Sequence, residues 1–244
     1  MPEKLDVIAF APHPDDAEAS CGGLLVKLVR HGYRAAICDL TRGELASNGS
    51  IEEREAEARR AAEVLGLHER INLQFPDGGL RRGNRDQLEA LVVLLRERSA
   101  RLIVAPHEAS RHPDHLEAGE LLRRAQFFCG VKRFVPHVAC VQRPVLIRAL
   151  DFHPMQPSFV VDITDELDVK LRGLRCHRSQ FERRPGDAPT LLNDPAYLRR
   201  IETNARTYGQ LIGRAAGEPY AVEGGVPLDD PVAVLAPSRE GVWP

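Results

Sequence analysis

Two clusters of histidine and aspartate stand out in the sequence because each follows a short apolar run. The first reads H-P-D-D at residues 13–16, and the second reads R-H-P-D-H at residues 111–115. A catalytic zinc ion takes three nitrogen or oxygen ligands from the protein and keeps one position for water. His13 and Asp16 are three residues apart, so one turn of backbone after the apolar run can direct both side chains to one ion.

The second cluster offers the third ligand of such a site. His115 and His112 are both candidates for that ligand. Asp15 would then point away from the metal, within hydrogen-bond distance of the water. Two histidines, one carboxylate on the metal and one spare carboxylate form a set that can carry out hydrolysis.

An ordinary strand-to-helix turn is the alternative for each cluster. Proline fits the first position of a helix, and aspartate caps the free amides of its first turn. Either cluster alone favours such a turn. Two clusters at the ends of two strands of one sheet favour a metal site, because turns do not require paired histidines.

The elements that must position these clusters can be read from the apolar pattern. Four short apolar runs bounded by turn residues predict buried strands at Leu5–Ala11, Arg34–Leu40, Arg70–Phe75 and Arg101–Pro106. The segments between them have helical periodicity. This alternation predicts an α/β fold, with a mostly parallel, Rossmann-like sheet and helices on both faces. Ligands bind such sheets beyond the carboxyl ends of the strands, where both clusters lie.

The remaining segments predict how the fold is completed. Ser50, with Glu53 three residues later, fits a capping box that starts the second helix and places Arg54 in its first turn. Two later segments look extended and predict extra strands at one edge of the sheet: HVACVQRPVLIRALDF (137–152) and FVVDIT (159–164). Helices are expected at 167–181 and 195–212, and an irregular surface tail from about residue 213. One domain spanning 1–244 is the expectation.

Composition excludes several classes of protein. The 33 basic and 35 acidic side chains leave a net charge of −2, so no global field recruits nucleic acid or a membrane. No run approaches the roughly 18 apolar residues of a membrane span, and the N-terminal run is too short for a signal peptide. The five scattered cysteines form no C-x-x-C pair and are expected to be small core residues in a reducing cytoplasm.

The glycines that follow the first cluster could suggest a phosphate-binding loop. Neither G-x-G-x-x-G nor G-K-[ST] is present, so nucleotide binding has little support. We expect Gly22 and Gly23 to let the backbone approach the site closely instead.

Taken together, AFAPHPDDAEASCGG and RHPDHLEAG resemble the LmbE-like or PIG-L family of zinc-dependent N-acetylglucosaminyl deacetylases. The segments CDLTRGELASNGSIEER, VLGLHERINLQFPDGGL, FVVDIT, SQF and EPYAVEG resemble the branch of that family that serves bacillithiol biosynthesis. Enzymes of that branch deacetylate N-acetylglucosaminyl-malate. The likeness runs from about residue 5 to residue 224, with the separate motifs in the same order.

The resemblance implies a role for each residue of the two clusters. His13, Asp16 and His115 would bind one zinc ion per chain, with Fe²⁺ or another divalent ion as the alternative, and Asp15 would be the general base. His112 would stabilise the oxyanion or act as the acid, and Asp114 would orient His112.

The resemblance also implies substrate contacts and an assembly. Arg54 matches an arginine that the family places at the substrate, and Arg111 is suited to a malyl carboxylate. We expect Glu44 and Asn48, which follow the second predicted strand, to contact the amino-sugar substrate as well. A homo-oligomer without nucleic-acid or membrane partners is expected. One departure is HVACVQRPV, which stands where close relatives carry tyrosines that could contact the oxyanion.

Three rival functions remain. The first is a family amidase that cleaves a bacillithiol S-conjugate or another N-acetyl sugar, with the same catalytic residues. The second is a non-haem iron oxygenase, because two histidines and a carboxylate also form its iron site; the β-α alternation disfavours this option. The third is a metal- or sugar-binding module without activity, which would need neither Asp15 nor His112.

Overall fold

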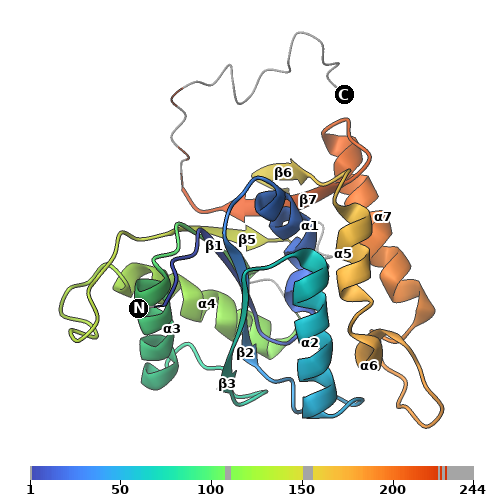
Figure 1. Cartoon of the computed structure of the whole chain (residues 1–244), viewed down its shortest axis with the longest axis horizontal. Coiled ribbons are helices and arrows are strands. Elements are labelled where there is room, and N and C mark those ends of the chain that lie inside the picture. The colour runs from blue at the N-terminus through green and yellow to red at the C-terminus, as the bar shows by residue number, and fades with distance from the viewer. Residues whose placement is uncertain (1, 108–110, 151–155, 225, 227–228, 230–244) are drawn as a thin grey trace.

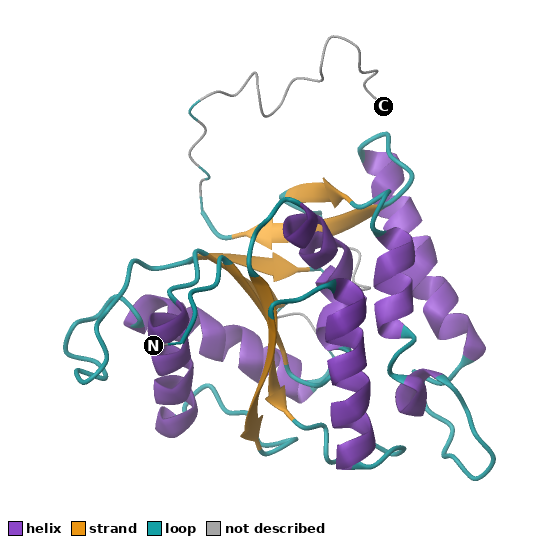
Figure 2. Ribbon diagram, in the orientation of Figure 1, coloured by secondary structure: helices purple, strands orange, loops and turns teal. Residues whose placement is uncertain are grey.

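Seven strands among the described residues form one mostly parallel sheet (Figures 1 and 2). The computed structural model describes residues 2–107, 111–150, 156–224, 226 and 229. The order across the sheet is β3-β2-β1-β4-β5-β7-β6. The strands are β1 (Val7–Ala11), β2 (Ala35–Thr41), β3 (Glu69–Phe75), β4 (Leu102–Pro106), β5 (Val145–Ala149), β6 (Phe159–Asp162) and β7 (Gly217–Val222).

Helices cover both faces of this sheet, as the sequence predicts (Figure 1). They are α1 (Asp16–Arg30), α2 (Ile51–Leu65), α3 (Arg85–Arg98), α4 (Pro113–Phe128), α5 (Leu167–Leu174), α6 (Arg178–Phe181) and α7 (Pro195–Leu211). The predicted cap of α2 is present, because the Ser50 side chain accepts a hydrogen bond from the Glu53 amide. Among the described residues, no helix combines the length and the apolar character needed to cross a membrane.

Alternate side chains of the central strands point into two separate cores. On β1, Ile8 and Phe10 pack with α3 and α4, whereas Val7 and Ala9 pack with α1 and α2. Both faces are buried, which explains why these strands read as continuous apolar runs. The expectation of small core cysteines holds for three of the five: Cys140 is exposed and Cys176 is half-buried.

The edge of the sheet beyond β4 contains the two predicted extra strands, β5 and β6, and a third strand, β7, that the sequence does not predict. β5 pairs parallel with β4, so it continues the main sheet, and β7 pairs antiparallel with both β5 and β6. The expected irregular tail from residue 213 is therefore wrong for 217–222, where Gly217–Tyr220 are buried. The expected helix at 167–181 is divided into α5 and α6. Residues 151 and 152, at the end of one predicted extended segment, lie outside the described residues.

The strand order places a crevice where the sequence expects the site. β1 pairs with β2 on one side and with β4 on the other, so the chain changes direction across the sheet between β1 and β4. Loops that leave the carboxyl ends of two such strands diverge and form a binding crevice. The 13–16 cluster follows β1, and the 111–115 cluster precedes and begins α4 after β4.

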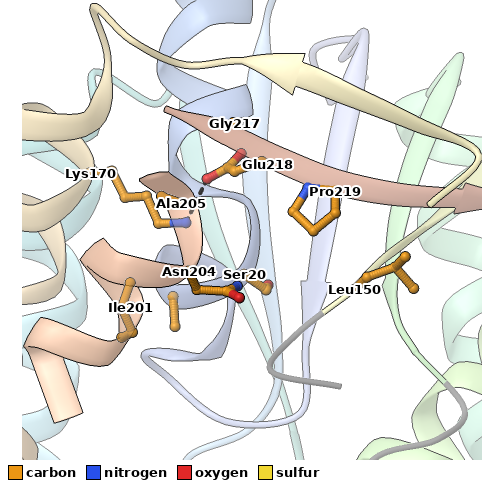
Figure 3. Close-up of a pocket in the computed structure, with 10 residues that line it drawn as sticks. Ser20, Leu150, Lys170, Ile201, Asn204, Ala205, Gly217, Glu218 and Pro219 are labelled. Carbon is orange, nitrogen blue, oxygen red and sulfur yellow. Dashed lines mark hydrogen bonds and ion pairs between the residues drawn. The ribbon is translucent and has the colours of Figure 1, made fainter. Parts of the chain in front are cut away.

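A kink in α1 is stabilised by β7, a strand that the sequence does not predict. Cys21 has non-helical backbone angles, which leaves the amides of Gly23 and Leu24 at the start of a new helical segment. Both amides donate to the carboxylate of Glu218 on β7, at 2.8 and 2.7 Å. The ammonium of Lys170 lies 2.6 Å from the same carboxylate (Figure 3). The C-terminal strand therefore caps the second half of α1.

The glycines at this kink do not serve the role predicted for them. A Cβ on Gly23 would lie 2.8 Å from Ile163 and 2.9 Å from a carboxylate oxygen of Glu218, and a Cβ on Gly22 would lie 3.2 Å from Lys170. Their missing side chains let α1 pack on α5 and β7. The expectation of a close approach to the site is wrong, because neither glycine lines the crevice.

Candidate active site

The first cluster and the second meet at one carboxylate oxygen. Oδ2 of Asp16 lies 3.1 Å from Nδ1 of His13 and 3.1 Å from Nε2 of His115. The same oxygen accepts the backbone amide of His13 at 2.9 Å, which fixes the turn after β1. The structure therefore brings together the three residues expected to bind the metal, although they are separated by about a hundred positions in the sequence.

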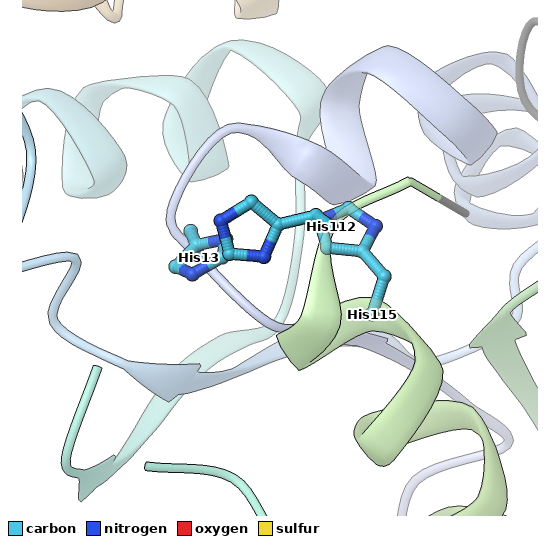
Figure 4. A group of neighbouring side chains, drawn as sticks. All are labelled: His13, His112 and His115. Carbon is cyan, nitrogen blue, oxygen red and sulfur yellow. The ribbon is translucent and has the colours of Figure 1, made fainter. Parts of the chain in front are cut away.

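The second histidine of the later cluster belongs to the same group. Ring nitrogens of His13, His112 and His115 all lie within 4.8 Å of one another. The ring centroids of His13 and His112 are 4.8 Å apart, and those of His112 and His115 are 5.4 Å apart (Figure 4). Either histidine of the 111–115 cluster is thus close enough to bind the same metal ion as His13.

Two further carboxylates lie on the other nitrogen of His13. Nε2 of His13 is 3.1 Å from Oδ1 of Asp77 and 3.4 Å from Oδ2 of Asp114. Metal-binding histidines usually donate their second ring nitrogen to a carboxylate, which fixes the tautomer and the ring. Asp77, in the loop after β3, was not among the predicted site residues. Its position at a strand end in FPDGG was the available signal.

The charges of the site favour a cation at His13. Burial alone would lower the pKa of His13, but its hydrogen bonds to Asp114, Asp16 and Asp77 raise the pKa to about 12. Three carboxylates around one histidine stabilise a positive charge there, which can be a proton or a divalent ion. Imidazole nitrogens and carboxylate oxygens are the donors that zinc takes, so the residues present fit a zinc-type ion.

Asp15 is held in an unusual conformation beside the cluster. Its φ angle is 118°, a region that non-glycine residues rarely adopt, and the residue is only 5% exposed. It makes no side-chain cap to α1, which disfavours the capped-turn alternative. Burial raises the pKa of Asp15 to about 6. Strained buried carboxyls of this kind occur at functional sites, where the strain aims the side chain.

Arg54 supports this conformation from the first turn of α2. Its Nη2 donates to the carbonyl of Pro14 at 2.8 Å and lies 3.3 Å from Oδ2 of Asp15, while Nη1 donates to the carbonyl of Gly43. A Cβ on Gly43 would lie 1.9 Å from Nη1, so only glycine leaves room for the guanidinium. Arg54 lines the crevice, but its Nη2 is directed to the loop that carries Asp15 and its Nη1 to the loop after β2.

His112 and Asp114 are arranged differently from the predicted pair. The backbone amide of Asp114 donates to Nδ1 of His112 at 3.3 Å, which places the proton of a neutral His112 on Nε2. Burial and the nearby His13 and His115 lower the pKa of His112. The Asp114 carboxylate instead accepts the Gly78 amide at 2.7 Å and faces His13. Its side chain therefore contacts His13, and its backbone amide contacts His112; the orienting role of Asp114 stays a prediction.

A cavity of about 660 Å³ opens over these residues. Arg111 lines it, is exposed, and makes no hydrogen bond or ion pair with the described residues. Neither Glu44 nor Asn48 is among the described residues that line the cavity, so their contact with the substrate stays a prediction. Glu44 accepts the amide of Asp77, and Asn48 exchanges two hydrogen bonds with the backbone of Ala188. Both residues fix loops behind the cavity wall.

Part of the cavity wall was missed in the sequence. Its members come from α6, the following loop and α7: Gln180, Leu191, Leu192, Tyr197 and Arg200. The segment HVACVQRPV does not line the cavity, and a tyrosine reaches it from α7 instead. Nothing in the residue types of α7 marks it as more than an ordinary surface helix.

A family comparison agrees with this geometry. Residues 8–126 match the family described as PIG-L, GlcNAc-PI de-N-acetylase. Diacetylchitobiose deacetylase from Thermococcus kodakarensis is 33% identical over 87% of this chain and 80% of its own length. The chain belongs to the PIG-L family of LmbE-like deacetylases. It is accordingly a metal-dependent hydrolase that acts on amides.

Two other PIG-L relatives extend the comparison. The protein named "Probable N-acetyl-alpha-D-glucosaminyl L-malate deacetylase 2" from Bacillus cereus is 26% identical, over 72% of this chain and 84% of its own. The crystal structure of the conserved protein TT1542 from Thermus thermophilus superposes with a TM-score of 0.84 at 35% identity. It covers 92% of this chain and 97% of that one. The fold of that solved structure thus extends over nearly the whole chain.

Proposed function

We propose that this PIG-L deacetylase hydrolyses the N-acetyl group of N-acetylglucosaminyl-malate, releasing acetate and glucosaminyl-malate for bacillithiol biosynthesis. The observation that carries the proposal is a buried, strained Asp15 beside converging His13, Asp16 and His115, in a cavity lined by Arg111. The similarity to the Bacillus cereus malate-conjugate deacetylase supports the substrate.

His13, Asp16 and His115 would hold one divalent ion, for which we propose zinc. Such an ion supplies Lewis-acid chemistry, because it polarises a carbonyl and makes water more acidic. Asp77 and Asp114 would orient the His13 ring from its Nε2 side, at 3.1 and 3.4 Å. Their carboxylates also balance the charge of the ion.

Asp15 would take the proton from the attacking water. Burial raises the pKa of Asp15 to about 6, close to the neutral pH at which a general base works best. Arg54 holds the loop that carries Asp15 and keeps the carboxylate directed into the cavity. The proton taken by Asp15 is then available to the departing sugar amine.

His112 would stabilise the oxyanion that forms when the water attacks the acetyl carbon. Its Nδ1 accepts the Asp114 amide, so Nε2 carries the hydrogen that can be donated. One such donor is worth roughly 2.7–4 kcal/mol to the transition state. Asp15, which holds the proton taken from the water, then protonates the amine as the carbon–nitrogen bond breaks.

Arg111 would bind a carboxylate of the malyl group. It lies directly before the second cluster, lines the same cavity and has no partner among the described residues. A guanidinium can bind a carboxylate through two parallel hydrogen bonds. This contact would distinguish the malate conjugate from a neutral amino sugar.

A second candidate substrate is a neutral N-acetylated disaccharide. It is favoured by the 33% identity to the diacetylchitobiose deacetylase, which is higher than the identity to the malate-conjugate relative. The catalytic residues would be the same, and only the group attached to the sugar would differ.

The experiment measures acetate release from three substrates by one purified sample: N-acetylglucosaminyl-malate, diacetylchitobiose and plain N-acetylglucosamine. Metal content is determined on the same sample, and the reaction is repeated without oxygen. We expect the highest kcat/KM on the malate conjugate and undiminished anaerobic activity. A higher kcat/KM on diacetylchitobiose would show that the neutral disaccharide, not the malate conjugate, is the substrate. A need for oxygen would show that the protein is an iron oxygenase and not a deacetylase.

A further inference from the structure

One wall of the cavity takes no part in the reaction described above. It consists of Leu191, Leu192, Tyr197 and Arg200, and we call it the α7 wall. The first two residues precede α7, and the other two lie in its first turns. The acetamido group needs only the histidine cluster and Asp15, so the α7 wall can bind another part of the substrate.

The size of the cavity leaves room for that second part. At about 660 Å³ it falls in the range of roughly 300–1,000 Å³ that holds a whole drug-sized ligand. An acetylated monosaccharide is smaller than such a ligand. A substituent on the sugar ring is therefore needed to fill the cavity.

The charges that line the cavity are separated. The carboxylates among its described lining residues, Asp15, Asp16 and Asp77, are all in the group around His13 and Arg54. The described lining residues outside that group include two exposed arginines, Arg111 and Arg200, and no acid. Positive charge on the solvent-exposed part of a cavity favours an anionic group on the substituent that extends toward it.

The α7 wall is positioned before any substrate binds. Asp194 caps α7 by accepting the Ala196 amide at 2.7 Å, which fixes its first turn. The ring of Tyr197 stacks on the buried Phe181 at 5.9 Å between centroids. Tyr197 and Arg200 are three residues apart, so they share one face of the helix, and the guanidinium lies 6.0 Å from the Tyr197 centroid.

We infer that the α7 wall is the subsite for the anomeric substituent of the substrate, with Arg200 pairing with an anionic group on that substituent. Tyr197 and the two leucines pack against its carbon atoms. The inference rests on the proposed N-deacetylase function and assigns to α7 a specificity role for that reaction. Carboxylate and phosphate share the required chemistry, and the experiment distinguishes them.

The experiment compares Arg200→Gln with the matched control Arg199→Gln. Both arginines are exposed neighbours on α7, but only Arg200 lines the cavity. The substrates are N-acetyl-α-D-glucosaminyl L-malate, N-acetyl-α-D-glucosamine 1-phosphate and the neutral methyl N-acetyl-α-D-glucosaminide. Calorimetric titration with glucosaminyl-malate, the deacetylated product, measures binding without turnover.

We expect Arg200→Gln to lower kcat/KM on at least one anionic substrate by about 10- to 100-fold, mainly through KM, as for the loss of a hydrogen bond to a charged group. The substrate with the larger loss shows whether carboxylate or phosphate is the natural group. On the methyl glycoside the loss should stay below about twofold, and Arg199→Gln should leave all three substrates unchanged. Binding of glucosaminyl-malate should weaken in parallel.

Equal losses on the neutral and anionic substrates, or equal effects of the two variants, would overturn the subsite. The proposed function fails separately, if the wild-type protein releases acetate from none of the three substrates. The titration with glucosaminyl-malate still tests the subsite in that case. Weaker binding of glucosaminyl-malate by Arg200→Gln than by Arg199→Gln supports the subsite, and equal or absent binding overturns it.

Discussion

The acidic residues at the start of α1 belong to two contrasting groups. Asp15 and Asp16 line the cavity, where Asp16 contacts two histidines and Asp15 contacts Arg54. Glu18, two residues later, is fully buried against Arg70 and His177, at 2.5 and 2.8 Å. Arg70 also forms two hydrogen bonds with Asp39.

The comparison shows that neighbouring acidic residues in one short segment, 15–18, can have different roles, some at the cavity and one in the packing of the fold. The carboxylate of Glu18 is paired with the guanidinium of Arg70 on β3 and with a ring nitrogen of His177 before α6, so its partners come from within the fold. Around His13 the carboxylates exceed the fixed cations, and the balance is left for a bound ion. A surplus of negative charge next to a cavity, rather than acidity itself, distinguishes the candidate site.

The largest effect should follow from removing a ligand on the cavity side. His13→Ala should lose the bound metal and reduce acetate release to the level of the assay blank, because Asp16 and His115 alone leave the ion under-coordinated. Metal content by mass spectrometry and acetate release check this. His31→Ala, an exposed histidine after α1, is the control. A His13→Ala protein with one metal per chain would contradict the assignment.

The next largest effect separates catalysis from metal binding within the same group. Asp15→Asn should keep the metal and lower kcat by about 10²- to 10⁴-fold, the usual contribution of a general base. Metal content and steady-state kinetics on the same preparation check this. A near-normal rate would remove Asp15 from the proton transfer.

The third prediction concerns the buried group. Glu18→Gln should lower the free energy of unfolding by about 1.5–3 kcal/mol, because Arg70 and His177 lose the charged acceptor of their hydrogen bonds while Arg70 keeps Asp39. Urea denaturation at neutral pH measures the loss. The exposed Glu55→Gln, on α2, is the matched control and should change stability by less than about 0.5 kcal/mol.

The same variant gives a prediction with a defined pH dependence. Burial alone would raise the pKa of Glu18, but the charges of Arg70 and His177 outweigh it and hold the pKa well below its usual value. The stabilisation is therefore complete above the usual glutamate pKa of 4.5 and declines as the pH falls below it. The difference between the wild type and Glu18→Gln should shrink on acidification. A constant difference down to about pH 3 would mean that packing, not charge, causes the loss.

The smallest effect is expected at Arg111, one of the two exposed arginines that line the cavity. Arg111→Ala should raise KM for N-acetylglucosaminyl-malate by about tenfold, as expected for one lost hydrogen bond to a charged group. For plain N-acetylglucosamine KM should change by less than about twofold. Arg101→Ala, an exposed arginine outside the cavity, is the control. Equal changes on both substrates would remove the carboxylate contact.

The sequence predicts the parallel half of the fold and the convergence of the two clusters for a simple reason. Continuous apolar runs such as VIAFA need a sheet buried on both faces, and that sheet brings all strand ends to one edge. β7 was not predictable in the same way. Its sequence GEPYAV contains glycine and proline, and its pairing with β5 and β6 is a long-range property.

The α7 wall escaped prediction for another reason. Tyr197 and Arg200 follow the pattern of an ordinary amphipathic helix, and only the path of the chain places them at the cavity. Asp77 could be predicted only in part. The sequence shows that Asp77 follows a strand, but it does not show the contact of Asp77 with His13. Side chains that act as ligands leave a signature in residue type, whereas side chains that shape a cavity do not.

The kink at Cys21 gives the site a dependence on the order in which the chain is made. Glu218, which caps the second half of the helix that carries Asp16, lies 195 positions after Gly23 in the sequence, so it is synthesised much later than the 13–16 cluster. The helix that carries Asp16 therefore receives its internal cap only after β7 has been synthesised. Completion of this helix is in this way tied to the synthesis of a distant strand.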